Sequence, residues 1–214
     1  MDVTDVSWDL SDLLGGRGEE AVDELLDDAD ARAAALATRR GQVAAFAVED
    51  LRGFMAERAE LEEVLGRAQA YALLRFATDT VDPARGALLQ RVQERTAAIA
   101  TRLVFFDVEW AGLDDQRSAE LLAGDGLDLC RHHLQTVRRY RGHLLTEPEE
   151  QVMTEKAVTG RGAWNRLFNQ LTSTIEVSLD GATLSLEEGL SRLQHPDREV
   201  RRAAAEAVTA GLAS

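Results

Sequence analysis

RGHLLTEPEEQVMTEKAVTGRGAWNRLF, residues 141–168, is the stretch that decides the fold. Thr146 and Glu149 have the Ser/Thr-x-x-Glu spacing of a capping box, and Pro148 is tolerated in the first turn of a helix. Gly160 and Gly162 interrupt the chain before a second run with apolar residues at helical spacing. The stretch therefore predicts a helix over 147–158, a glycine break, and a further helix that contains Trp164 and Phe168.

The residues before this stretch have helical periodicity almost throughout. Apolar residues recur every three or four positions in five segments, which predict helices at 19–38, 43–79, 83–110, 115–122 and 125–140. The second segment is long for one helix, so we expect a bend near 49–53. The third has a strong start, because Asp82 suits the N-cap and Pro83 suits the first turn. We expect Gly112 to end it.

One segment has the pattern of a β-hairpin. In TIEVSLDGATL, residues 174–184, apolar residues alternate with polar ones, and Asp180-Gly181 is a preferred dipeptide for a type I′ turn. Ser185 and Glu188 form another capping box, and Asp197 is placed to cap a last helix through Ala210. The predicted fold is mainly α: an elongated multi-helix bundle with one small β-hairpin near residues 174–184.

Composition narrows the class of partner. The net charge is −14, and residues 1–30 contribute −10 of it, with eleven acidic residues against one arginine. Such a chain should be repelled by nucleic acid and by anionic lipid. No apolar run is long enough to span a membrane, and the first residues are acidic where a signal peptide is basic. We expect a cytoplasmic protein that binds neither nucleic acid nor membrane.

No residue pattern indicates catalysis or metal binding within the chain. Four histidines are present, at 132, 133, 143 and 195, and none begins a His-Glu-x-x-His motif. Cys130 is the only cysteine, and its spacing from Leu127 and Leu134 favours a buried residue on an apolar helix face over a nucleophile. We therefore expect no catalytic residue, no metal ligand and no cofactor in this chain.

One basic group stands out. Arg131, Arg138, Arg139 and Arg141 are close in sequence, with no acidic residue from 131 to 146. The group could bind an anion or a peptide carboxylate, but pairing inside the chain is the favoured interpretation in such an acidic protein. Arg138, Arg139 and Arg141, together with Arg166, are the candidates for contact with a substrate.

Five short motifs in order resemble the N-terminal region of oligoendopeptidase F, a family of thimet-oligopeptidase-like zinc metallopeptidases. The matching residues are Trp8, Leu10, Asp12 and Leu13; Phe105, Phe106 and Glu109; His143, Leu144, Thr146, Glu149 and Glu150; Ala163, Trp164, Arg166, Leu167 and Phe168; and Asp197, Arg198, Arg201 and Ala204. The resemblance spans nearly all of residues 1–214.

The resemblance implies a cytoplasmic zinc endopeptidase whose helical halves enclose a deep cleft for short, unfolded peptides. In that family the His-Glu-x-x-His motif and a downstream Glu hold the zinc, in a C-terminal catalytic domain. None of those positions lies in 1–214. The resemblance thus implies that this chain is the lid and wall region, inactive alone, with the C-terminal catalytic domain as its partner.

Two alternatives remain open: a stand-alone helical interaction module that kept the fold without the enzyme, and a complete enzyme with a different site. If the catalytic domain is missing, an apolar face should lack a partner. We expect that face near Trp164, Leu167, Phe168 and the hairpin 175–184, and we expect the chain to form a homo-oligomer through it, more strongly at high salt.

Overall fold

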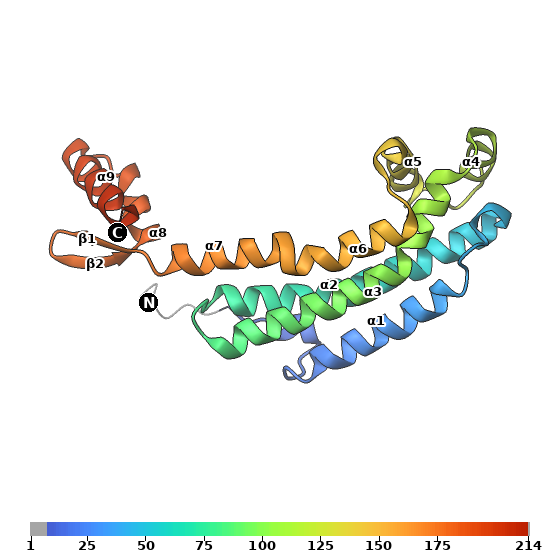
Figure 1. Cartoon of the computed structure of the whole chain (residues 1–214). Coiled ribbons are helices and arrows are strands. Elements are labelled where there is room, and N and C mark those ends of the chain that lie inside the picture. Colours follow the sequence, from blue (N-terminus) through green and yellow to red (C-terminus); the bar gives the residue numbers. More distant parts are fainter. Residues whose placement is uncertain (1–7, 214) are drawn as a thin grey trace. The chain divides into compact units, whose positions relative to one another are not determined.

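The computed structural model describes residues 8–213, and these residues divide into two compact units between Thr159 and Gly160. The fold is mainly α with one two-stranded sheet, as predicted (Figure 1). The elements of the first unit are η2 (Ser11–Leu14), α1 (Ala21–Ala37), η3 (Val43–Ala45), α2 (Val48–Ala77), α3 (Pro83–Gly112), α4 (Asp115–Leu122), α5 (Arg131–Arg139), η4 (Arg141–His143) and α6 (Glu147–Ala157).

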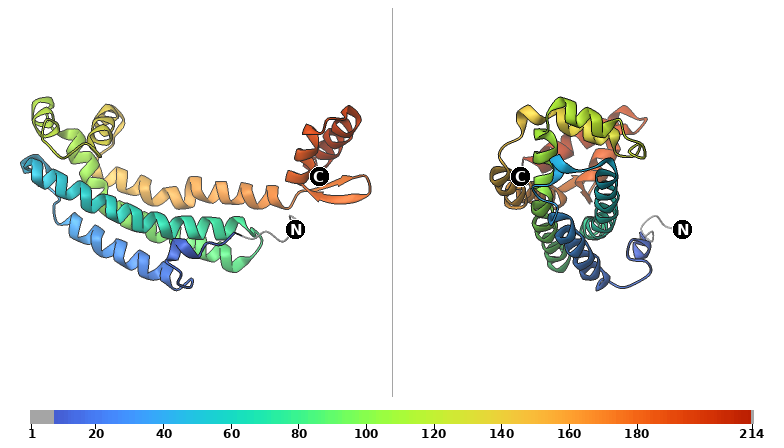
Figure 2. Two further views of the ribbon diagram at one scale, coloured as in Figure 1. Left: turned by 180° about the vertical axis from the view of Figure 1, so that it is seen from behind. Right: turned by 90° about the vertical axis from the view of Figure 1, so that its right-hand side faces the viewer.

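Three of these helices form the body of the first unit. Helices α1, α2 and α3 lie side by side in Figure 1 and in both views of Figure 2, and α6 packs along α3. Helices α2 and α3 have 30 residues each, a length of about 45 Å, so they bury one another over many turns. The Asp82 carboxylate accepts from the N–H of Ala84 at 2.8 Å, which confirms the predicted start of α3.

The core ends in an aromatic cluster formed by α2, α3 and the turn before α2. Phe54 stacks on Phe106 with ring centroids 4.4 Å apart, and Phe106 in turn stacks on Trp110 at 6.4 Å. Phe46 and Phe105 complete the cluster through tilted and edge contacts with Phe54. All five rings are buried. Such offset and edge contacts stabilise a core beyond the burial of area alone.

The acidic start of the chain contributes ion pairs between helices. Asp23, Asp27 and Asp30 lie along α1 and pair with Arg91, Arg95 and Arg102 of α3, at 3.4, 2.8 and 3.1 Å. Their side chains are largely solvated, so each pair contributes little stability. The pairs do balance charge locally, which lowers the repulsion that a net charge of −14 would otherwise cause.

The predicted helix at 43–79 is wrong at its start. The chain is extended at Phe46 and Ala47, α2 begins at Val48, and the helix runs through 49–53 without the expected bend. The Asp50 carboxylate accepts from the N–H of Ala47 at 3.0 Å, and Arg117 binds the carbonyl of Phe46. These contacts fix the break two residues before the expected bend.

The predicted helix at 125–140 is also wrong at its start, because α5 begins only at Arg131. Gly126 has a φ of 79°, a left-handed conformation that ends regular helix, and the turn around it packs against α2. Leu127 is still buried, but it lies in this turn instead of on a helix face with Cys130 and Leu134.

Gly160 interrupts the helical run as predicted. The segment Val158–Gly162 has π-helical hydrogen bonding, and Gly160 within it has a φ of −91° and a ψ of −106°. The second unit then contains α7 (Ala163–Ser173), β1 (Glu176–Leu179), β2 (Ala182–Ser185), α8 (Leu186–Ser191), η6 (Arg192–Gln194) and α9 (Arg198–Leu212).

The hairpin forms as predicted. Strands β1 and β2 are antiparallel, with Leu179 paired to Ala182, and Asp180 and Gly181 both have positive φ, as a type I′ turn requires. Its apolar side chains are not part of an exposed patch, which corrects that expectation. Val177 and Leu179 are buried, because α8 and α9 pack on β1 and supply the cover that a two-stranded sheet needs.

Helix α9 approaches the hairpin so closely that a side chain at one of its glycines would overlap the strand. A Cβ at Gly211 would lie 2.7 Å from the carbonyl oxygen of Glu176 in β1, and the backbone there cannot easily give way. In contrast, Gly66 is in the interior of α2 with nothing within 4 Å of its Cβ position.

We predict opposite effects for two glycine-to-alanine substitutions. Gly211→Ala should destabilise the second unit by about 1–3 kcal/mol through overpacking. Gly66→Ala should stabilise the first unit by up to about 1 kcal/mol, because alanine is the better helix former. Hydrogen exchange of β1 and α2 amides reports each unit separately. Unchanged protection of β1 in the Gly211→Ala chain would refute the close packing of α9.

Candidate functional site

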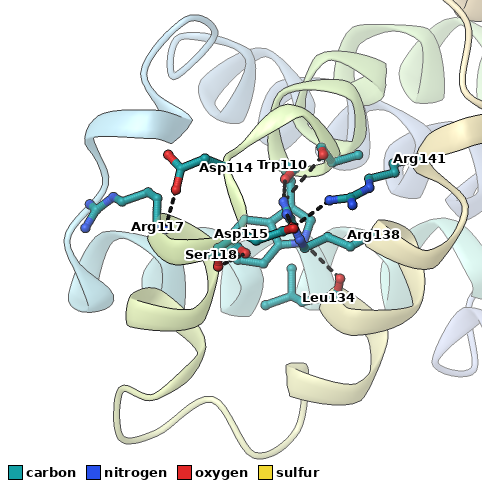
Figure 3. Close-up of polar contacts among 9 residues, drawn as sticks. Trp110, Asp114, Asp115, Arg117, Ser118, Leu134, Arg138 and Arg141 are labelled. Carbon is teal, nitrogen blue, oxygen red and sulfur yellow. Dashed lines mark hydrogen bonds and ion pairs between the residues drawn. The ribbon is translucent and has the colours of Figure 1, made fainter.

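The arginine group of residues 131–141 is mostly committed to contacts inside the chain, as the favoured interpretation predicted. Arg138 donates to the carbonyl of Trp110 at 2.9 Å, to that of Ala111 at 3.4 Å and to the Asp115 carboxylate at 2.7 Å (Figure 3). Its side chain is only 10% exposed. Because the last carbonyls of a helix lack partners within the helix, Arg138 acts as the C-terminal cap of α3.

A second hydrogen bond joins α3 and α5 in the opposite direction, from α3 to α5. The Trp110 indole N–H donates to the carbonyl of Leu134 in α5 at 2.9 Å, so each helix binds the backbone of the other through one long side chain (Figure 3). Asp115, at the start of α4, also accepts from Arg141 at 2.6 Å. We call Trp110, Asp115, Arg138 and Arg141 the Trp110 clasp. It joins the ends of α3, α4 and α5 around a buried hydrogen bond.

The two other members of the arginine group differ. Arg131 donates to the carbonyl of Gly124 and pairs with Asp128 at 3.4 Å. Arg139 is exposed in the last turn of α5, and within residues 8–213 it has no hydrogen-bonding or charged partner. The structure thus gives Arg138 and Arg141 structural contacts, and their predicted contact with a substrate stays a prediction.

Several charged residues that carry the resemblance also bind backbone groups inside the chain. The Glu109 carboxylate accepts from the N–H groups of Gly41 at 2.7 Å and Val43 at 3.3 Å, which fixes the turn between α1 and α2. The Glu149 carboxylate accepts from the N–H of Thr146 at 2.9 Å and completes the predicted capping box of α6.

The last motif caps and packs α9. The Asp197 carboxylate accepts from the N–H of Glu199 at 2.8 Å, and Arg201 binds the carbonyls of His195 and Pro196. Ala204 is fully buried. The predicted cap is therefore confirmed, and the motif is explained by the fold of the second unit.

Helix α7 is the exception. Its apolar residues Trp164, Leu167, Phe168 and Leu171 are three or four positions apart, so they share one side of the helix, and all four are exposed. Trp164 is 70% exposed and Phe168 is 66% exposed. We call these four residues the α7 face. An exposed tryptophan and phenylalanine side by side are typical of a protein-binding surface.

The charge around the α7 face differs from that of the chain as a whole. From Lys156 to Ile175 there is no acidic residue, although the net charge of the chain is −14. Arg166, the predicted substrate contact on this helix, is half-buried. The α7 face is thus an apolar surface in a segment without negative charge, and it would not repel an acidic or neutral partner.

The described residues do not hold the side chains of a metal site. In residues 8–213 no three His, Cys, Asp or Glu side chains gather closely enough to bind one ion. His132 and His133 are exposed on α5, and His195 lies before α9. A zinc ion therefore has no fitting ligand set in this part of the chain. No helix described here is long and apolar enough to cross a membrane.

These features define the described region as a helical fold that presents the apolar side of helix α7. Residues 109–176 match the family model Peptidase_M3_N, which is described as Oligopeptidase F. The matched range begins at the Trp110 clasp and includes α6, Gly160 and the α7 face. The resemblance to the N-terminal region of oligoendopeptidase F is confirmed.

Two solved structures are similar in fold. Oligoendopeptidase-F from Enterococcus faecium superimposes with a TM-score of 0.73 at 17% identity, over 91% of this chain and 40% of that one. A putative peptidase from Chlamydophila abortus superimposes with a TM-score of 0.51 at 19% identity, over 97% of this chain and 36% of that one. No curated protein matches the chain significantly. This chain spans well under half the length of both structures.

We predict that the Trp110 clasp contributes most of the free energy that holds α5 against α3 and α4. Arg138→Met keeps the apolar stem but removes the side-chain donor of the Ala111 carbonyl and one of the two donors of the Trp110 carbonyl, which also accepts from the N–H of Leu113 at 3.4 Å. The substitution should therefore destabilise the first unit by about 2–3 kcal/mol. Arg139→Met, one residue along the same helix, should change stability by less than about 0.5 kcal/mol. Urea unfolding followed by tryptophan emission measures both, in chains that also carry Trp8→Phe and Trp164→Phe so that Trp110 is the only emitting tryptophan. Equal losses for the two variants would contradict the clasp.

A second prediction concerns pH. Hydrogen bonds from Arg141, and then from Arg138, hold the pKa of Asp115 below its ordinary value of 3.8. A carboxyl whose pKa is lower in the folded state stabilises the fold above the ordinary value, and this stabilisation is lost as the pH falls through the lowered pKa.

The Asp115→Asn chain lacks this contribution at every pH. Wild type should therefore be more stable than Asp115→Asn near neutral pH, and the difference should shrink as the pH falls below about 4. Thermal unfolding of both chains across a pH series measures the difference. A difference that stays constant down to acid pH would show that Asp115 does not stabilise the clasp as a charged group.

Proposed function

We propose that this chain is the N-terminal helical part of a zinc-dependent oligoendopeptidase, and that it forms one wall of the cleft that admits short peptides. The observation that carries the proposal is the α7 face. The Ala163–Phe168 motif lies within the family match, yet Trp164, Leu167 and Phe168 are exposed and do not build the core of the second unit. Exposed apolar residues within a matched segment suit contact with another part of a larger protein.

The proposed division of labour follows from the residues that are present. The described residues offer no ligand set for zinc, so the ion, the activated water and the general base would come from a catalytic domain outside this region. The long helices of this chain would limit the width of the cleft and so exclude large substrates. The α7 face would bind the catalytic domain. A short oligopeptide would be the substrate, and the cytoplasm would be the compartment.

Activity tests this proposal directly. The chain alone, supplied with zinc, should not hydrolyse an internally quenched nonapeptide. The reading frame that adjoins residue 214 should encode a segment with His-Glu-x-x-His. Co-expression of that segment with this chain should give hydrolysis that a chelator abolishes. Chelator-insensitive hydrolysis by the purified chain would instead support a complete enzyme with a different site.

Binding between this chain and the segment with His-Glu-x-x-His tests whether the α7 face is their contact surface. Trp164→Ser together with Phe168→Ser should weaken the association at least about 30-fold, since buried aromatic anchors carry most of the energy of an interface. Asn165→Ser together with Asn169→Ser changes the polar side of the same helix and serves as the matched control.

The alternative is a stand-alone helical module that binds another protein through the α7 face. An adjoining sequence without His-Glu-x-x-His, or a catalytic segment that does not bind this chain, would favour it. Self-association of the isolated chain through the α7 face is the prediction for a chain whose catalytic domain is missing, and sedimentation across a salt series measures it.

A further inference from the structure

A cavity of about 300 Å³ lies between α2 and the turn that precedes α5. Met55 and Ala59 of α2, with Leu129 and Cys130 of the turn, supply its apolar lining. The volume is at the lower end of the range for ligand sites, which suits a small molecule or one or two residues of a peptide. Leu129 is fully exposed, so it is available to cover a ligand at the mouth of the cavity.

Two arginines line the cavity, and within the described residues only one of them has carboxylate partners. Arg58 is bound by Asp107 at 2.8 Å and by Glu62 at 2.9 Å, and its guanidinium lies 5.6 Å from the centre of the Phe106 ring. Its positive charge is therefore already compensated. Arg52 has no carboxylate partner within residues 8–213. The cavity thus has one guanidinium available for an anion beside an apolar lining.

The fold positions Arg52 before any ligand arrives. Gly126 has a positive φ of 79°, and a Cβ at that position would lie 2.9 Å from Cδ of Arg52 and 3.3 Å from one of its terminal nitrogens. The arginine stem therefore packs directly on the backbone of the turn. Such contact limits the rotamers of the side chain and lowers the entropy that binding would cost.

We propose that this cavity binds a small apolar group that carries a terminal carboxylate, with the apolar group against Met55 and Ala59 and the carboxylate on Arg52. A guanidinium binds a carboxylate through two parallel hydrogen bonds, which gives both strength and orientation. The C-terminal leucine of a short peptide and a medium-chain fatty acid both have this chemistry. The proposal rests on the cavity alone and does not depend on the proposed peptidase role.

Cys130 provides the measurement, because it is the only cysteine of the chain and it lines the cavity. Burial raises the pKa of its thiol, so alkylation is best followed at about pH 8.5, where enough thiolate forms. Iodoacetamide is neutral, and its rate should respond little to the charge of Arg52. A ligand in the cavity should slow the alkylation of Cys130, and the concentration that halves the rate gives the affinity.

The probes are acetyl-Ala-Leu with a free carboxylate, the same dipeptide as its amide, octanoate, and octanamide. The carboxylates should protect Cys130, and the amides should need a concentration at least about tenfold higher. Whichever carboxylate binds more tightly identifies the source, peptide or fatty acid. Equal protection by carboxylates and amides, or no protection by any probe at millimolar concentration, would overturn the proposal.

Substitutions test whether Arg52 itself binds the carboxylate or whether any loss of positive charge weakens protection. Arg52→Gln should weaken protection by the carboxylates about tenfold and leave protection by the amides unchanged. Arg139→Gln, an exposed arginine outside the cavity, should leave both unchanged. Ala59→Leu should fill the cavity and abolish protection; a thermal melt establishes that this variant is folded. Undiminished carboxylate protection in Arg52→Gln would exclude Arg52 as the anchor.

Discussion

The hydrogen bond from the buried Trp110 indole to the carbonyl of Leu134 is the interaction on which the first unit depends. Trp110 stacks on Phe106 at the end of the aromatic cluster, so it is completely removed from water. An indole N–H in that position is costly unless an acceptor is present. Helix α5 supplies the acceptor, and its Arg138 supplies donors for the end of α3. The core of the bundle can therefore bury Trp110 only when α5 is in its place.

Charged residues of the motifs that resemble oligoendopeptidase F likewise serve as partners for backbone groups. Glu109, Glu149, Asp197 and Arg201 all look like functional charged residues in the sequence, and each binds backbone groups at a turn or a helix end. Carboxylates and guanidinium groups are efficient caps, because one side chain satisfies several backbone groups that would otherwise lack partners. These residues hold the region in shape, and they leave binding to surfaces that the fold does not use.

The α7 face and the cavity beside Cys130 are two such surfaces, and they differ in character. The α7 face is apolar, contains two large aromatic residues and lies in a segment without acidic residues, which suits contact with another folded segment. The cavity beside Cys130 is small and has one guanidinium available, which suits a ligand that is itself small and negatively charged. The α7 face suits assembly with another folded segment, and the cavity suits binding of a small ligand.

The sequence by itself determined the class of fold, the hairpin, the glycine break at Gly160, most helix ends and the resemblance to oligoendopeptidase F. These depend on interactions between residues a few positions apart: periodicity, capping boxes and the Asp180-Gly181 turn. The resemblance also led to the prediction that Trp164, Leu167 and Phe168 are exposed, because it implies a catalytic domain outside this chain.

Only the tertiary structure decided what depends on residues far apart in the chain. The start of α2 depends on the local contact of Asp50 and also on Arg117, which is 71 positions from Phe46. The start of α5 depends on a turn that packs on α2. The hairpin is covered because α9 returns to it. Arg138 and Arg52 look alike in the sequence, yet one is a helix cap and the other has no carboxylate partner in the described chain. Local patterns carry no information about such pairings, since they arise from packing between helices.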